Sequence, residues 1–172
     1  MGLDVSAIHA IKLNMEEVPS PLGCDGDEII HIVNEHPFGD RLGGRDAGMY
    51  QLTDSKHFYR NSYGGYNEWR RTLAEIVGYP QKVGKTRTGA DVGAWEATSG
   101  PFWKLIYFSD CEGYIGGTVL EKLYRDFTDW QNRINEWVQL DSDHRADFSN
   151  GYLSMRECFA EAVEWKGFVE FA

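Results

Sequence analysis

Hydrophobic and polar residues alternate along the first part of the chain. From Leu3 to Leu13 every second residue is on one side of an extended backbone, and this period of two predicts a strand over residues 3–13. Residues 28–33 (EIIHIV) are rich in β-branched side chains and predict a second, largely buried strand. Residues 49–52 predict a short third strand. The segments 14–27 and 34–48 are rich in turn-forming residues and predict loops.

After residue 61 the apolar spacing becomes helical. A helix that opens within residues 62–71 has one apolar stripe and ends at Gly78 and Pro80; the stripe is Tyr66, Trp69, Leu73, Ile76 and Val77. Residues 81–100 predict an exposed loop, and Pro101 suits the first turn of a short helix that ends at residue 108.

The last third of the chain predicts two more helices. After a loop at 109–117, Thr118 and Glu121 form a capping-box pair at the start of the longest helix, whose apolar stripe runs to residue 138. Charged and turn-forming residues interrupt the pattern at 139–151. A final helix spans 152–166 and ends at Gly167, and the apolar tail 168–172 could add an edge strand.

Strands therefore come first and helices later, which predicts the α+β class. We expect a small antiparallel sheet from the N-terminal strands, with the C-terminal tail as a possible edge strand, covered on one face by three to four helices. There is no internal repeat and no composition shift, so residues 1–172 are expected to form a single domain.

Composition narrows the classes of partner. The net charge of −10 disfavours direct contact with nucleic acid, and leaves a basic host protein as a possible partner. Aromatic residues make up 14% of the chain, so some rings could line a binding surface. Three widely spaced cysteines fit reduced thiols, and no apolar run suits a membrane span or a secretory signal. We expect a cytoplasmic protein without a cofactor.

Two segments carry a resemblance. Residues 62–74 (SYGGYNEWRRTLA) and 101–117 (PFWKLIYFSDCEGYIGG) resemble a set of uncharacterised bacterial and phage proteins that share SYxGYNxWR and FSDCEGxIG segments. The resemblance covers roughly residues 58–172. It implies a bacterial or phage setting and brings no activity, cofactor or site residue with it.

The first candidate site is the glycine-containing helix start at residues 62–71. Backbone N–H groups at a helix N-terminus favour an anion, arginines add charge, and tyrosine rings offer faces for stacking. This combination suits a small anionic, nucleotide-like ligand, held by Ser62, Tyr63, Gly64, Gly65, Tyr66, Asn67, Arg70 and Arg71. The competing interpretation is a glycine turn that enters a structural helix, with Arg71 paired to an acidic neighbour and Tyr66 in the core.

The second candidate is the loop 109–113. Asp110 and Glu112 flank Cys111, which invites an acid–base pair, a metal-ligand pair or a nucleophile. The carboxylates would raise the pKa of the thiol, which disfavours a thiolate nucleophile. The competing interpretation is that Asp110 caps the turn and Cys111 packs as a small hydrophobic residue.

Histidines give a weak metal candidate. His31 and His36 are five residues apart, with His9 on the neighbouring strand, but a metal would need a further ligand. His9 and His31 fall on apolar faces, where a hydrogen-bonded core histidine is commoner, so no metal is expected.

Three functional hypotheses remain from the sequence. The leading one is a non-enzymatic binding protein, of a phage or mobile-element accessory type, that holds a small anionic ligand or a partner between residues 62–71 and the 109–113 loop, with Trp95 adding contact area. The second is a small hydrolase or transferase that uses Asp110, Glu112 and a histidine. The third is a purely protein-binding acidic module.

Overall fold

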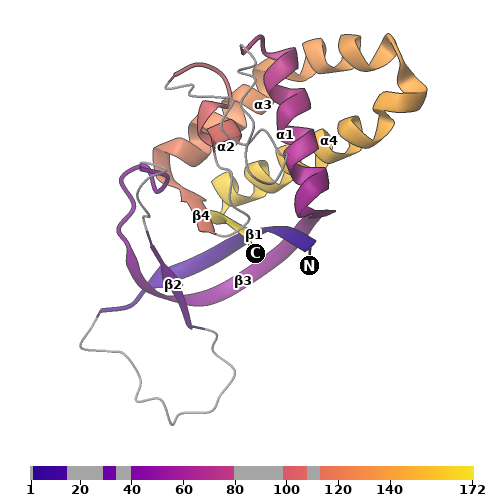
Figure 1. Ribbon diagram of the computed structural model, residues 1–172. Helices are drawn as coiled ribbons and strands as arrows, with labels where there is room; N and C mark the ends of the chain where they lie inside the picture. The colour runs from indigo at the N-terminus through magenta and orange to yellow at the C-terminus, as the bar shows by residue number, and fades with distance from the viewer. Residues whose placement is uncertain (1, 15–28, 34–39, 80–98, 108–112) are drawn as a thin grey trace, which may run out of the picture.

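The computed structural model describes residues 2–14, 29–33, 40–79, 99–107 and 113–172 (Figure 1). These residues form five strands and four helices, in the α+β arrangement that the sequence predicts. The order along the chain is β1 (Gly2–Lys12), β2 (Ile29–Ile32), β3 (Gly48–Ser62), α1 (Tyr63–Ile76), α2 (Trp103–Tyr107), β4 (Gly113–Gly116), α3 (Gly117–Gln139), α4 (Ser142–Glu164) and β5 (Phe168–Phe171).

The strands make one antiparallel sheet in the order β2-β3-β1-β5-β4, and the helices gather on one side of it (Figure 1). The expectation of an edge position for the C-terminal strand is wrong, because β5 lies between β1 and β4. The pairing brings the two ends of the chain together: Asp4 N donates to Ala172 O at 2.8 Å, and Ala172 N donates to Asp4 O at 3.0 Å. An inner place suits β5, since three of its four residues are buried.

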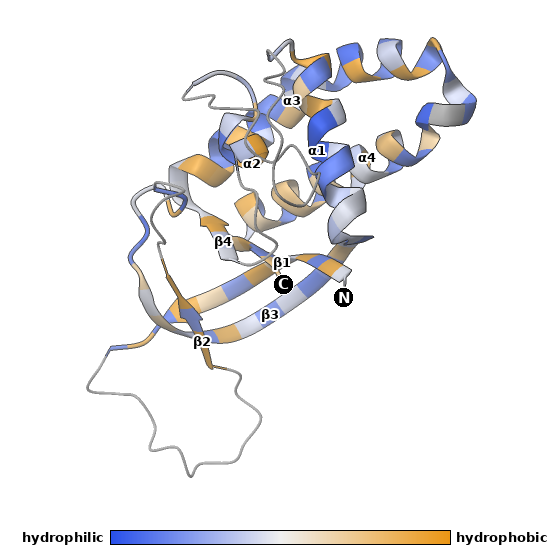
Figure 2. Ribbon diagram, in the orientation of Figure 1, coloured by the Kyte–Doolittle hydropathy of each residue, from blue (hydrophilic) through white to orange (hydrophobic). Residues whose placement is uncertain are grey.

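β1 buries residues on both faces of the sheet. Leu3, Val5 and Ala7 join the main core, as the alternation predicts. Figure 2 shows hydrophobic and hydrophilic segments alternating along β1. Ile8 and Ala10 belong to a second apolar cluster on the other face, made with Ile30, Ile32, Leu42, Tyr50 and Phe168. Two irregularities in the β1–β3 register, at Val5/Ser6 and His9/Ala10, add residues to β3 and help the sheet to curl over these clusters.

One strand is longer than the sequence predicts, and another lies in a predicted loop. The mostly polar residues that follow position 52 continue β3 as far as Ser62, because all of them except the two bulge residues, Thr53 and Phe58, pair with the apolar strand β1. β4 falls in the predicted loop 109–117 and pairs with β5. The extent of β3 and the formation of β4 therefore depend on cross-strand partners that are distant in sequence.

The start of α3 also differs from the prediction. The capping box of Thr118 and Glu121 is absent, since the N-cap is Gly116 without a side-chain cap bond. Instead Gly43 O accepts from Thr118 N at 3.0 Å, so the loop after residue 39 supplies the cap. Gly43 has φ +55, and a Cβ there would lie 2.4 Å from Thr118 N, so only glycine allows this contact.

Helix α4 begins ten residues earlier than predicted, at Ser142 rather than 152. The sequence suggests a break because of the turn formers before Gly151. A Cβ at Gly151 would meet the Trp69 indole at 3.0 Å and Tyr59 at 3.1 Å, so this glycine lets α4 pack closely on α1 and β3. The other helices agree with prediction: Ser62 caps α1, Gly78 follows its end with φ +85, and α2 falls within 101–108. Within the described residues, none of the helices is both long and apolar enough for a membrane span.

Candidate functional site

The predicted anion site at the start of α1 is only partly available at the surface. Ser62 is the N-cap, and its Oγ accepts from Gly65 N at 3.0 Å, so the protein itself satisfies one of the N–H groups expected to bind an anion. The side chain of Asn61 fills the space beside Gly65: a Cβ there would lie 2.1 Å from Asn61 Oδ1. Gly64 is exposed and nothing lies near it.

Tyr66 and Arg70 lie in the interior. Tyr66 is fully buried and stacks on Trp69, with 6.2 Å between ring centroids. Arg70 is 3% exposed; its NH1 donates to Ile106 O at 2.8 Å and its NH2 to Asn67 Oδ1 at 2.5 Å. The guanidinium also lies 5.3 Å from the Tyr66 ring centroid. Arg70, Asn67 and Tyr66 therefore tie α1 to α2 and to the core. The burial of Tyr66 agrees with the competing interpretation of this segment, which made no statement about Arg70.

The remaining two members of the predicted set do not converge with them. Arg71 is partly exposed and forms an ion pair with Glu68, with 2.7 Å between NH1 and Oε2. Tyr63 is half-buried and packs against the main core. The eight residues are close in sequence, but the structure divides their side chains between the surface and the core. Arg70 cannot be removed as a test of ligand binding, because its loss disturbs the packing of α1.

The second predicted site lies largely outside the described residues. The residues outside are Asp110, Cys111 and Glu112. Trp95, which was expected to add contact area, also lies outside the described residues. Gly113 is described, has φ +131, and borders the buried guanidinium of Arg41, which would lie 3.2 Å from a Cβ at this position. Arg41 is 2% exposed, and sequence reasoning missed it because it stands in a polar, glycine-rich segment that gives no sign of burial.

The histidines do not form a metal centre in the part of the chain that the structure describes, where no cluster of three ligand-type residues occurs. The expectation that His31 is a core residue is wrong: β2 turns Ile30 and Ile32 inward and exposes His31. His9 is half-buried, and its Nδ1 lies 2.6 Å from Thr53 Oγ1. His36 lies outside the described residues.

An exposed polar cluster on β1 and β3 was not predicted. Arg60 donates to both carboxylate oxygens of Asp4, at 2.6 Å and 3.2 Å, and His57 Nδ1 lies 3.8 Å from Asp4 Oδ1. The hydrogen bonds from Arg60 lower the pKa of Asp4 below its usual value. Only the strand register brings these residues together, so spacing along the chain could not reveal them. The cluster is a solvent-exposed ion pair between neighbouring strands. Such a pair is more typical of a contact that stabilises a sheet than of a catalytic group.

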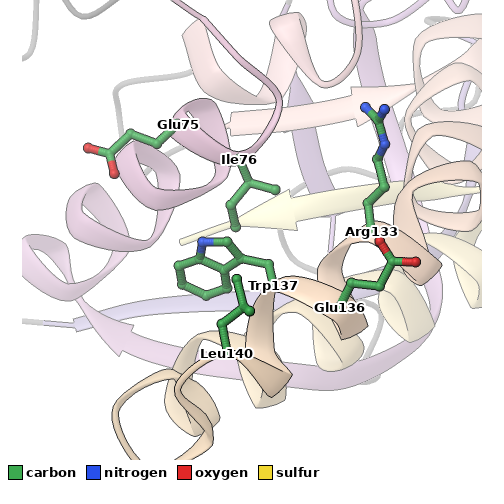
Figure 3. A pocket seen from close by; sticks show the side chains of 6 residues that line it. All are labelled: Glu75, Ile76, Arg133, Glu136, Trp137 and Leu140. Carbon is green, nitrogen blue, oxygen red and sulfur yellow. The ribbon is translucent and has the colours of Figure 1, made fainter.

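Sequence analysis also missed a groove between the C-terminal ends of α1 and α3. It has a volume of about 570 Å³ and is lined by Glu75, Ile76, Arg133, Glu136, Trp137 and Leu140. In Figure 3 the Trp137 indole is central, with Ile76 and Leu140 beside it and Glu75 and Glu136 on opposite sides. The groove is shallow and largely open to solvent rather than an enclosed cavity.

The Trp137 side chain in this groove is held by two residues of α4. Arg145 of α4 lies 4.0 Å above the Trp137 ring and donates to Trp137 O at 2.5 Å, and Phe148 meets the indole edge to face at 5.3 Å. Leu140, by contrast, is 79% exposed, the largest exposed fraction among the described large hydrophobic residues. The groove therefore combines a fixed aromatic ring with an exposed leucine.

Comparisons with known proteins identify no relative: no family model, no curated protein and no solved structure matches the chain. The function therefore has to be argued from the geometry of this chain.

Proposed function

We propose that this protein is a non-enzymatic binding protein that docks a partner protein in the groove between α1 and α3. The observation that carries the proposal is the exposed Leu140 beside the fixed indole of Trp137. A single exposed leucine needs no explanation, but one that adjoins a second and a third apolar side chain across a groove forms a continuous patch. Ile76 supplies that third side chain from α1.

The energetics of this patch favour a macromolecular partner. Complete burial of a leucine side chain contributes about 1.5–3 kcal/mol, and Leu140 keeps most of its surface exposed. Trp137 is already held by Arg145 and Phe148, so binding would cost little additional side-chain entropy there. The tip of the α3–α4 hairpin projects beyond the sheet, where a partner can approach it (Figure 1).

The small anionic ligand of the leading sequence hypothesis receives less support. Two of the groups chosen to hold it, Tyr66 and Arg70, are buried and engaged within the protein. The groove is lined by two carboxylates and one guanidinium, that of Arg133, so its lining has no net positive charge to attract an anion. A partner protein is therefore the alternative that the described surface supports best.

Site-specific photo-crosslinking tests the proposal. A photoreactive amino acid is placed at position 140 and, as a matched control, at position 153, because Leu153 is also an exposed leucine (40%) but lies on α4 outside the groove. In cells that produce the protein, we expect an adduct with one partner from position 140 only. The purified partner should then bind wild type at least about tenfold more tightly than Leu140→Ser, a difference of ~1.4 kcal/mol.

Equal adducts from positions 140 and 153 would place the interaction elsewhere. A purified partner that binds Leu140→Ser as tightly as wild type would likewise contradict the proposal. Leu153→Ser serves as the control for any loss of stability in the binding assay, since both leucines are exposed and neither substitution opens a cavity in the core.

A further inference from the structure

We infer that the partner segment is an amphipathic α-helix whose apolar side chains are flanked by lysine or arginine. This inference rests on the proposed function, because it concerns the same groove, and adds the conformation and charge of the occupant. Two properties of the groove support it: its described lining residues belong to helices or their caps rather than to a strand, and carboxylates outnumber cations among them.

Several backbone groups around the groove have partners within the protein. At the end of α1, Val77 N donates to Leu73 O, and the next two N–H groups donate to carbonyls of the same helix. At the end of α3, Trp137 O accepts from Leu140 N and from Arg145 NH1, and Val138 O accepts from Asp141 N. An extended peptide depends on main-chain hydrogen bonds to an exposed strand, and the lining residues belong to helices or their caps. A segment that satisfies its own backbone, which is a helix, avoids that cost.

The charges of the residues that line the groove favour a cationic helix. Glu75 and Glu136 lie on opposite sides of the apolar floor, and both are exposed. Among the residues that the structure describes, no cation pairs with Glu136. One cation, Arg133, also lines the groove and lies 4.8 Å from the Trp130 ring centroid, so two carboxylates and one guanidinium leave the lining with one net negative charge. Arg145 of α4 covers Trp137.

The hairpin turn extends this acidic surface. Asp141 and Asp143 are exposed where α3 passes into α4, next to Leu140. The whole chain carries a net charge of −10, which attracts a cationic segment over a longer range and opposes the docking of a second copy of this chain. A helix with leucine-like residues on one side and lysine on both flanks would place apolar atoms on Trp137 and ammonium groups toward the carboxylates.

The test uses a designed probe with the full-length protein. The probe is a fluorescein-labelled leucine–lysine–alanine peptide of about 18 residues, about five helical turns, with leucines at helical spacing on one face. Its first companion has glutamate in place of every lysine. Its second companion has the same charge and leucine count but two interior prolines, which prevent a helix. Fluorescence anisotropy measures the affinity of each peptide.

We expect only the helical lysine peptide to bind, with affinity that falls as salt screens the charges. Leu140→Ser should weaken binding at least about tenfold, and Glu136→Lys by a similar factor. Glu121→Lys is the matched charge control, because Glu121 is exposed on the same helix but about 22 Å away from position 136 along its axis. It should change the affinity less than about twofold.

The outcomes separate the inference from the proposed function. If the glutamate peptide or the proline peptide binds as well as the lysine helix, and Leu140→Ser weakens both, the groove is a docking site but its preference for a basic helix is refuted. If the lysine helix binds equally to wild type, Leu140→Ser and Glu136→Lys, the contact is non-specific and the inference is refuted. The crosslinking experiment at position 140 then decides the proposed function independently.

Discussion

Arg70 provides the most direct test of how the start of α1 is built. Its guanidinium is 3% exposed and donates to Ile106 O at 2.8 Å and to Asn67 Oδ1 at 2.5 Å. Hydrogen bonds that involve a charged group contribute about 1.5–3 kcal/mol each, and removal of one partner leaves a buried carbonyl unsatisfied. We therefore expect Arg70→Ala to lower the free energy of unfolding by about 3 kcal/mol.

The assay is urea unfolding followed by tryptophan fluorescence and by circular dichroism, with agreement between the two probes as the check of two-state behaviour. In a protein of this size a loss of 3 kcal/mol corresponds to a decrease in Tm of about 6–12 °C. Arg71→Ala is the matched control. Arg71 is one residue away and its pair with Glu68 is solvent-exposed, so its removal should cost less than about 0.5 kcal/mol.

Arg70→Met refines the experiment, because methionine retains much of the side-chain volume without the charge. If the cost of Arg70→Ala comes from lost packing alone, Arg70→Met should recover most of it. If the hydrogen bonds to Ile106 and Asn67 matter, Arg70→Met should remain at least about 1.5 kcal/mol less stable than wild type. A stability of Arg70→Ala equal to that of Arg71→Ala would refute the assignment of Arg70 to the core.

Three further perturbations test other parts of the structure. Gly43→Ala should cost about 2–4 kcal/mol, since its Cβ would lie 2.4 Å from Thr118 N, whereas Gly44→Ala, with φ +86 but open space, should cost about 1 kcal/mol; equal losses in urea unfolding would contradict the cap on α3. Burial raises the pKa of Tyr79 from 10.0 to about 12, so the folded state retains a proton that the unfolded state loses. Stability should therefore fall as pH rises from 10 to 12, and less steeply in Tyr79→Phe; parallel pH profiles of the two proteins would contradict this. Burial also raises the pKa of the Cys158 thiol, so in a variant whose other two cysteines are serine, a thiol reagent should react only after unfolding, and rapid labelling of the folded protein would show that the site is open.

The candidate site was harder to predict than the fold. The segment 62–71 has the composition of an anion site, but composition does not show which face of a helix packs inward. Arg70 illustrates this: a basic residue in a helix is usually exposed, and here α2 offers a carbonyl that allows its burial. The groove joins Ile76 to Trp137 and Leu140, some sixty residues later, so no local pattern could reveal it.

The amino-acid sequence by itself determined the elements that have strong periodicity. The strand β1, the helices α1 and α3, and the α+β class follow from apolar residues repeated at intervals of two or of three and four, because one face of each element must be removed from water. The end of α1 could be predicted from Gly78, because glycine readily adopts the positive φ that ends a helix.

Only the tertiary structure decided the rest. The polar half of β3 is a strand because β1 pairs with it, β5 is an inner strand because β4 covers its other edge, and α3 is capped by the carbonyl of Gly43. Position 151 of α4 suits a glycine because a Cβ there would lie 3.0 Å from the Trp69 indole. In each case the deciding partner is distant along the chain, and local propensity is worth less than the hydrogen bonds and packing that the partner supplies.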